Sequence, residues 1–246
     1  MADAGIDQAA VSDADVGHVI VAARNEADRI AATVEALQEA FNGAIVIVAD
    51  DGSDDETGGI AGRAGAIVVG GGQHLGKGGA ASLAAERALK DGAPRPGAVV
   101  LLADADLAES AARLAPLARA VAQGDADIAV AIFASRVGGG FGLALGFAHW
   151  AIKRRCGLDT GAPISGQRAL SYRALAAVTP FHSGFGMEIG MTVDAVRAGF
   201  TVKEVELNLA HRATGKSLRG FIHRGRQLKD FLKVFWRTRK PGLAGA

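Results

Sequence analysis

The fold is decided by residues 99–106, which read Val-Val-Leu-Leu-Ala-Asp-Ala-Asp. Five consecutive apolar residues predict a buried strand, and two aspartates, Asp104 and Asp106, follow it directly. Two carboxylates with one residue between them can reach one hard divalent cation such as Mg²⁺ or Mn²⁺. A lone Asp-x-Asp pair is also common in solvated turns, so a metal site here needs support from the rest of the chain.

Apolar strands and helical segments alternate outward from this stretch in both directions. Such alternation predicts right-handed βαβ units and an α/β fold with a mostly parallel central sheet flanked by helices. Ligands bind such sheets beyond the carboxyl ends of the strands. We expect strands at 18–23, 44–49, 66–69, 98–103, 128–134, 164–171 and 201–209, and helices at 30–41, 56–64, 80–90, 110–123, 141–155, 187–198 and 218–236.

The composition is that of a globular protein. The 246 residues are 49% hydrophobic and 22% charged, which excludes a chain that is disordered throughout. We expect a flexible tail over 1–17 and a single domain over 18–240. Within this domain, residues 18–134 should bind a nucleotide, residues 135–217 should bind the other substrate, and residues 218–240 should form a basic amphipathic helix.

The cysteine content and the lack of targeting segments indicate the compartment. The single cysteine, Cys156, excludes an internal disulfide and favours a reducing compartment. No apolar run reaches the roughly 18 residues that a membrane span needs. The acidic N-terminus also lacks the basic-then-apolar order of a secretory signal. We therefore expect a cytoplasmic protein.

The charge is distributed unevenly along the chain. Residues 211–240 hold ten lysines and arginines and one acid, whereas the rest holds 17 basic and 25 acidic residues. This asymmetry predicts an anionic partner for the C-terminal segment. The helix at 218–240 could lie peripherally on the inner face of an anionic membrane, or pack on the body of the protein with its basic face in solvent. Nucleic acid is a poor candidate because only 5% of residues are aromatic.

Polar loops follow two further strands. Asp50 and Asp51 could accept hydrogen bonds from a nucleotide base or ribose, or could belong to a capping turn. Residues 71–78 nearly match the P-loop spacing G-x-x-x-x-G-K-[ST], with Gly78 where the Mg²⁺-binding hydroxyl belongs. Two interpretations stay open: Lys77 faces a nucleotide phosphate or ribose, or the chain is a P-loop-like NTPase.

The second half of the chain offers its own candidates. His211 and Arg212 follow an expected strand, where a histidine can ligate a metal and an arginine can bind phosphate oxygens. Lys216 lies four residues further on and could bind phosphate as well. Glu188 begins an otherwise apolar helix, where it could act as a base, orient an acceptor hydroxyl, or only stabilise the helix N-terminus.

Taken in order, these motifs resemble the family 2 glycosyltransferases of the GT-A fold. The similarity extends over about residues 19–235. The resemblance implies a GT-A (Rossmann-like) fold, a nucleotide-sugar donor, and Mg²⁺ or Mn²⁺ as cofactor. The stretches that carry it are 19–26, 50–53, 76–78, 104–106, 164–169, Glu188 and 211–212.

The resemblance also implies roles for single residues. For the nucleotide sugar these are Ala23, Arg24 and Glu26 in the loop after the first strand, Asp51 at the base, Lys77 over the nucleoside, and Asp104. For the metal they are Asp104, Asp106 and His211, with Asp106 the more direct ligand. The implied catalytic residues are Glu188, Asp106 and Arg212, and the implied acceptor-binding residues are Arg168, Lys216 and Ser217.

Two subgroups of the family are similar to different parts of the chain. Polyprenyl-phosphate sugar synthases share a stretch like 165–168, but often have a metal-binding glutamine where this chain has Ala108. Glucosyl-3-phosphoglycerate synthases resemble 186–190 and use a histidine before an arginine as the third metal ligand. Their phosphoglycerate-binding motif has no clear counterpart in 135–141.

The sequence therefore predicts a metal-dependent transfer of a sugar from a nucleotide diphosphate to a phosphate-bearing acceptor. The acceptor would be a polyprenyl phosphate, consistent with a peripheral membrane contact, or a phosphoglycerate-like molecule. An inactive relative that only binds a nucleotide sugar and a homodimeric assembly both stay open.

Overall fold

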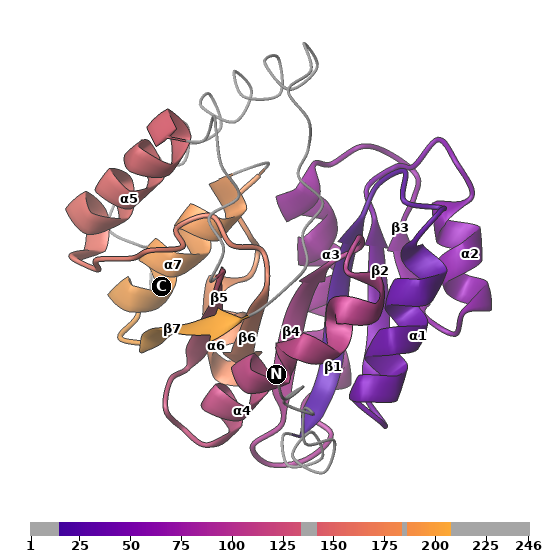
Figure 1. Cartoon of the computed structure of the whole chain (residues 1–246), viewed down its shortest axis with the longest axis horizontal. Helices are drawn as coiled ribbons and strands as arrows, with labels where there is room; N and C mark the ends of the chain where they lie inside the picture. Colours follow the sequence, from indigo (N-terminus) through magenta and orange to yellow (C-terminus); the bar gives the residue numbers. More distant parts are fainter. Residues whose placement is uncertain (1–14, 134–141, 184–185, 208–246) are drawn as a thin grey trace, which may run out of the picture.

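A computed structural model of the chain describes residues 15–133, 142–183 and 186–207. Within these ranges seven strands form one mixed sheet in the order β3-β2-β1-β4-β6-β5-β7. Helices cover both faces of the sheet, so the molecule is built of three layers (Figure 1). The predicted α/β architecture with a mostly parallel sheet is confirmed.

The first half alternates strands and helices in the predicted order. β1 pairs in parallel with both β2 and β4, and β2 pairs in parallel with β3. Successive strands therefore extend the sheet to opposite sides of β1, which creates the crevice where α/β sheets bind ligands. The elements are β1 (Val16–Ala23), α1 (Ile30–Ala40), β2 (Ile45–Asp50), α2 (Thr57–Arg63), β3 (Ile67–Gly70), α3 (Lys77–Asp91) and β4 (Val99–Asp104).

The second half adds one strand that runs against the others. β6 is antiparallel to both β4 and β5, whereas β5 and β7 are parallel. The amino end of β6 therefore lies at the same edge of the sheet as the carboxyl end of β4, with Arg168 opposite Leu102. The elements are η2 (Ala108–Leu114), α4 (Ala115–Ala122), β5 (Ile128–Phe133), α5 (Gly142–Cys156), β6 (Arg168–Ser171), α6 (Tyr172–Val178), α7 (Met187–Arg197) and β7 (Val202–Leu207).

Three elements differ from the sequence prediction. The strand expected from residue 164 begins only at Arg168, because a turn precedes it in which the Ser165 N–H donates to a carbonyl. The helix expected over 110–123 is divided into η2 and α4, with Pro116 in the first turn of α4, where proline is favoured. The short helix α6 was not predicted; the Ser171 hydroxyl caps it by accepting from the Ala174 N–H.

Some predicted segments cannot be compared with the structure. The tail before residue 15 and the basic helix at 218–240 lie outside the described residues. β1 begins at Val16, two residues earlier than expected. No helix within the described part of the chain combines the length and the apolar composition that crossing a bilayer requires.

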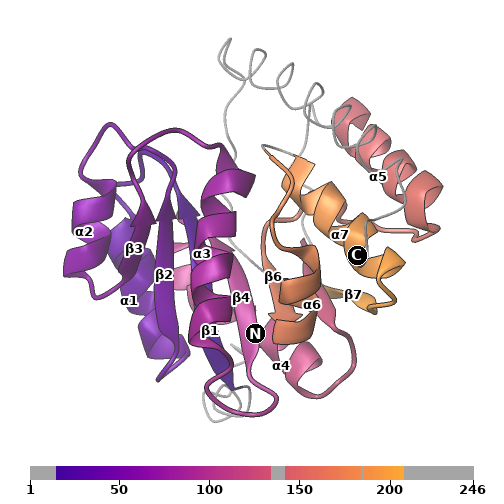
Figure 2. The ribbon, with the colours of Figure 1, turned by 180° about the vertical axis from the view of Figure 1, so that it is seen from behind.

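Two apolar layers hold the helices to the sheet. One lies between the sheet and α1, α2, η2 and α4, and the other lies between the sheet and α3, α6 and α7, which Figure 2 shows from behind. Successive residues of a strand point to opposite faces, so Val19 and Val21 enter the first layer and Ile20 the second. α5 packs through a smaller cluster onto α7.

The central strand provides a test of this core. Leu101 on β4 is fully buried, so Leu101→Ala should lower the free energy of unfolding by about 2–5 kcal/mol. Leu83 on α3 is 37% exposed, and Leu83→Ala should change it by less than about 0.5 kcal/mol. Urea denaturation of both variants measures the difference; equal losses would contradict the packing described here.

Candidate active site

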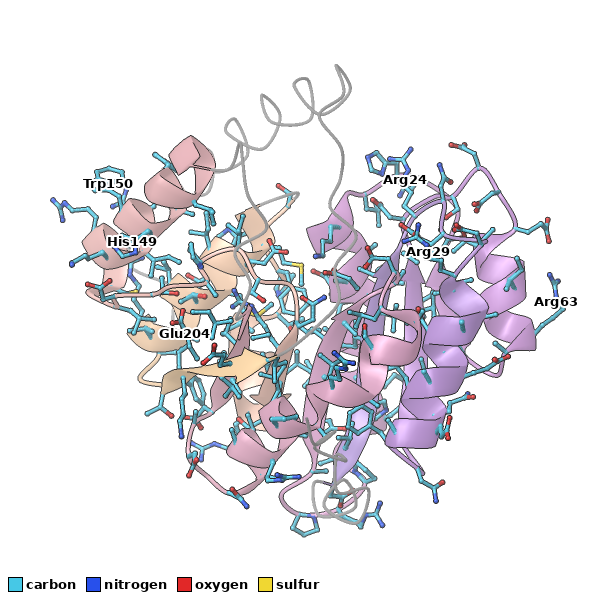
Figure 3. The ribbon with its side chains drawn as sticks, in the orientation of Figure 1. Arg24, Arg29, Arg63, His149, Trp150 and Glu204 are labelled. Carbon is cyan, nitrogen blue, oxygen red and sulfur yellow. The ribbon has the colours of Figure 1, made fainter. Side chains whose placement is uncertain are left out.

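The carboxyl ends of β2, β1 and β4 lie side by side. Ala23 is in register with Asp50, and Ala22 is in register with Asp104. The loops that follow these strands therefore meet at one edge of the sheet, where Figure 3 shows Arg24 and Arg29. This edge brings together the polar residues that the sequence places at the ends of the first, second and fourth strands.

The loops after β1 and β2 are cross-linked by hydrogen bonds. The Asn25 N–H donates to the Ser53 hydroxyl at 3.0 Å, and the Asp54 N–H donates to the Asn25 side-chain oxygen at 2.8 Å. Asp50 Oδ1 accepts from the Ser53 N–H at 2.9 Å and from its hydroxyl at 2.6 Å. The structure thus uses Oδ1 of Asp50 inside the turn, while the contact with a base or ribose considered from the sequence stays a prediction.

Asp51 holds the glycine loop in place. Its Oδ1 accepts from the N–H groups of Leu75 and Gly76, both at 2.8 Å, and its Oδ2 lies 2.8 Å from His74 Nδ1. The guanidinium of Arg24 in turn lies 2.9 Å from the His74 ring nitrogens. Asp51 is buried, so its predicted contact with a nucleotide base would compete with bonds that shape the loop.

This arrangement contradicts the P-loop interpretation. A P-loop would turn its loop N–H groups toward a phosphate. Here the N–H groups of residues 75 and 76 donate to Asp51 instead. A Cβ at Gly78 would overlap the carbonyl oxygen of His182, so the serine or threonine of a P-loop has no room there. Gly78 is therefore a packing requirement between α3 and the loop before α7.

Lys77 bridges two carboxylates from distant parts of the chain. Its Nζ lies 2.8 Å from Asp104 Oδ1 and 3.1 Å from Glu188 Oε1. The other oxygen of Asp104 accepts from Gln167 Nε2 at 2.8 Å. A Cβ at Gly166 would lie 2.8 Å from Lys77 Nζ, so the absent side chain leaves space for the ammonium.

The electrostatics of this bridge favour the charged lysine. Burial by itself would lower the pKa of Lys77, but the carboxylates of Asp104 and Glu188 outweigh it and raise the pKa above its ordinary value. Glu188 is buried at 5% exposure.

Gln167 is a residue of this site that the sequence did not predict, although it lies within the stretch 164–169 that carried the family resemblance.

A second acidic cluster lies beside the bridge. Asp106 has a side-chain exposure of 35%, and its nearest cation among the described residues, Arg29, is 3.9 Å away. Burial raises the pKa of Glu26, and the neighbouring charge of Asp106 raises it further. These are the surroundings in which a bound cation would relieve repulsion between carboxylates.

The remaining predicted residues are placed as follows. Ala23 is buried, and its carbonyl accepts from the Asp51 N–H at 2.9 Å. Arg168 is 1% exposed and so offers almost no surface to an acceptor; its predicted acceptor contact stays a prediction. Within 15–133, 142–183 and 186–207, no three histidine, cysteine or acidic side chains are grouped to hold a metal. His211, Arg212, Lys216 and Ser217 lie outside the described residues.

Comparison with known proteins identifies the family to which the chain is related. The model of the family described as "Glycosyl transferase family 2" matches residues 18–173. No curated protein matches the chain. Solved structures of glucosyl-3-phosphoglycerate synthase from Mycobacterium tuberculosis are similar throughout, which confirms a GT-A-like fold.

Three of these structures differ in what they contain. The complex with phosphoglyceric acid is 23% identical, covers 97% of this chain and 84% of that chain, and has a TM-score of 0.72. The complex with Mn²⁺, UDP-glucose and phosphoglyceric acid is 24% identical over 93% and 82%, with a TM-score of 0.67. The complex with Mn²⁺, UDP-glucose and glycerol 3-phosphate is 25% identical over 92% and 82%, with a TM-score of 0.65.

Completing the P-loop spacing tests the packing at α3. Gly78→Ser should lower the free energy of unfolding by about 1–3 kcal/mol, because the added atoms meet the His182 backbone. Gly72→Ser is a matched control, since a Cβ there meets nothing within 4 Å, and should change it by less than about 0.5 kcal/mol. Chemical denaturation measures both; tighter ATP binding by the Gly78→Ser protein would restore the P-loop interpretation.

Proposed function

The chain belongs to glycosyl transferase family 2, and from this premise we propose that it moves a sugar from a nucleotide diphosphate to a phosphate-bearing acceptor with a divalent cation as cofactor. The observation that carries this proposal is the bridge of Lys77 to Asp104 and Glu188 at the carboxyl end of β4. The complexes of the mycobacterial synthase with UDP-glucose and either phosphoglyceric acid or glycerol 3-phosphate support the choice of donor and acceptor class.

The nucleotide end of the donor would lie on the cross-linked loops after β1 and β2. Arg24 is exposed there and offers a guanidinium to the donor. Lys77 begins α3, a helix of 15 residues, so its ammonium and the positive end of the helix dipole act at the same place. Both would stabilise the negative charge that develops on the departing nucleotide diphosphate.

The acidic pair at the carboxyl end of β4 suits a divalent cation. Carboxylate oxygens are the donors that Mg²⁺ and Mn²⁺ prefer, and Asp106 is 35% exposed with no cation nearer than 3.9 Å in the described part of the chain. Asp104 and Asp106 would hold the ion, together with His211 as the resemblance implies. A cation bound there would neutralise charge on the diphosphate as it leaves.

Glu188 would serve the acceptor. Its carboxylate is buried and held by Lys77 at 3.1 Å, at the first turn of α7. In an inverting transfer to a hydroxyl, Glu188 would receive the proton of the attacking group; in a retaining transfer it would only orient that group. Arg212, Lys216 and Ser217 would bind the acceptor phosphate, since cationic and hydroxyl side chains are suited to its oxygens.

The donor and its metal can be tested together. We expect one nucleotide sugar from a panel, with UDP-glucose tested first, to bind in the presence of Mn²⁺ and to release nucleoside diphosphate when phosphoglycerate or a polyprenyl phosphate is added. Calorimetry measures binding, and the two acceptors distinguish the two acceptor sources. Asp106→Asn should lower turnover by about 100-fold or more, since it removes one negative charge at nearly constant size.

The matched control for this experiment is Asp125→Asn. Asp125 is 47% exposed and pairs with Lys203. It precedes β5 by a few residues, so it lies at the edge of the sheet opposite to the carboxyl end of β4. Its substitution should leave turnover unchanged. Binding of no donor by the folded protein would contradict the proposed function, whereas binding without transfer to any acceptor would favour an inactive relative.

Removing Lys77 should make the metal bind more tightly. In the absence of nucleotide, Lys77→Met leaves Asp104 and Glu188 without their shared cation, so we expect the affinity for Mn²⁺ to rise by about fivefold or more. Electron paramagnetic resonance of free Mn²⁺ measures this directly. Lys90→Met, at an exposed position of the same helix, should have no effect. An unchanged affinity in the Lys77→Met protein would place the cation away from Asp104.

A further inference from the structure

We infer that Arg168 is a positioning residue that holds the first turn of α7, and with it Glu188, in place against the sheet. Because Glu188 belongs to the site of the proposed function, this role rests on that function. It differs from the acceptor contact expected from the sequence, for which Arg168, at 1% exposure, offers almost no surface.

Arg168 is a charged side chain in an apolar layer. It is 1% exposed and is among the largest fully buried side chains of the described residues. Its neighbours across the sheet are Leu102 on β4 and Val130 on β5. Burial lowers the pKa of Arg168 to about 10, against the opposing influence of Glu188 and Glu204, so the guanidinium stays charged at neutral pH.

A hydrogen-bonded chain leads from Arg168 to the backbone of Glu188. Arg168 Nη1 donates to the Thr192 hydroxyl at 2.9 Å, and that hydroxyl donates to the Glu188 carbonyl at 3.0 Å. Arg168 Nε donates to the Ser165 carbonyl at 2.9 Å. The guanidinium therefore ties the turn before β6 to the first turn of α7.

The same short segment also reaches the other carboxylate of the bridge. Gln167, the residue before Arg168, donates to Asp104 at 2.8 Å. Residues 165–168 thus contact Asp104 directly and Glu188 through Thr192, and Lys77 spans the two carboxylates. In the role we infer, Arg168 would therefore help to set where Glu188 lies relative to Asp104.

The charge of Arg168 is not explained by packing alone. A leucine or methionine would fill this layer without the cost of desolvating a guanidinium. Arg168 Nη2 is buried without a hydrogen-bond partner among the described residues. Two acidic residues act on this cation from different elements: Glu188 on α7, and Glu204 on β7, labelled in Figure 3. The retained cation is consistent with a role in placing Glu188.

Thr192 allows the role to be tested without removing the arginine. Thr192→Val deletes the hydroxyl at constant shape, and we expect it to lower kcat by about tenfold to a hundredfold while KM for the donor changes less than about twofold. Thr192→Ser keeps the hydroxyl and should restore kcat. Thr179→Val removes a similar bond, from a threonine hydroxyl to the carbonyl of Leu175 at 2.8 Å, and should leave kcat unchanged.

A second readout does not depend on activity. If Glu188 is displaced, the Lys77 ammonium loses one partner, and its rate of acetylation by a lysine-directed reagent should rise several-fold in Thr192→Val but not in Thr192→Ser. Mass spectrometry of the peptide that contains Lys77 measures this rate. Arg168→Gln should show the same increase, and its melting temperature reports whether it folds.

The outcomes separate this inference from the proposed function. If the unmodified protein transfers no sugar but Lys77 reactivity follows the Thr192 hydroxyl, then the proposed function is wrong and the positioning role stands. If transfer is observed, and neither kcat nor Lys77 reactivity responds to Thr192→Val, then Arg168 has no positioning role. Equal falls in stability, kcat and affinity across all variants would also overturn it, because a purely structural residue would give that result.

Discussion

The rest of the site depends on the carboxylate of Asp104, which receives Lys77 on one oxygen and Gln167 on the other. Lys77 is the first residue of α3, and Gln167 is the residue directly before β6. The side chain of Asp104 therefore connects the two halves of the sheet. Lys77 also contacts Glu188, which leaves one positive charge between two negative ones. The partly exposed carboxylate of Asp106, close to this bridge, adds negative charge that a cationic ligand at the edge of the sheet would offset.

The acidic residues near this edge divide into two kinds. Asp50 and Asp51 are buried and accept hydrogen bonds from nearby loops, so they stabilise the local fold. Asp106 is partly exposed, and the nearest cation in the described part of the chain is Arg29 at 3.9 Å. Its carboxylate is therefore available to a ligand. Under the proposed function, the buried acids would hold the loops on which the nucleotide lies, and Asp106 would supply oxygen donors to the metal.

Local patterns in the sequence predicted most of the elements but not how distant residues pair. Apolar runs and helical spacing gave the order of the strands and long helices, since both signals depend on neighbouring residues. The antiparallel direction of β6 and the contact of Lys77 with Glu188, 111 positions later, depend on tertiary packing. The seven-residue helix α6 is too short for a periodic signal, although Ser171, which caps it, could have indicated where the helix begins.

The most direct measurement is a crystal structure with Mn²⁺ and UDP-glucose, in which anomalous scattering locates the metal. We expect the manganese peak within bonding distance of Asp106, the diphosphate beside Lys77, and the bonds from Arg168 through Thr192 to Glu188 unchanged. A manganese peak away from both aspartates, or a diphosphate bound outside the edge formed by β1, β2 and β4, would contradict the assignment of this site.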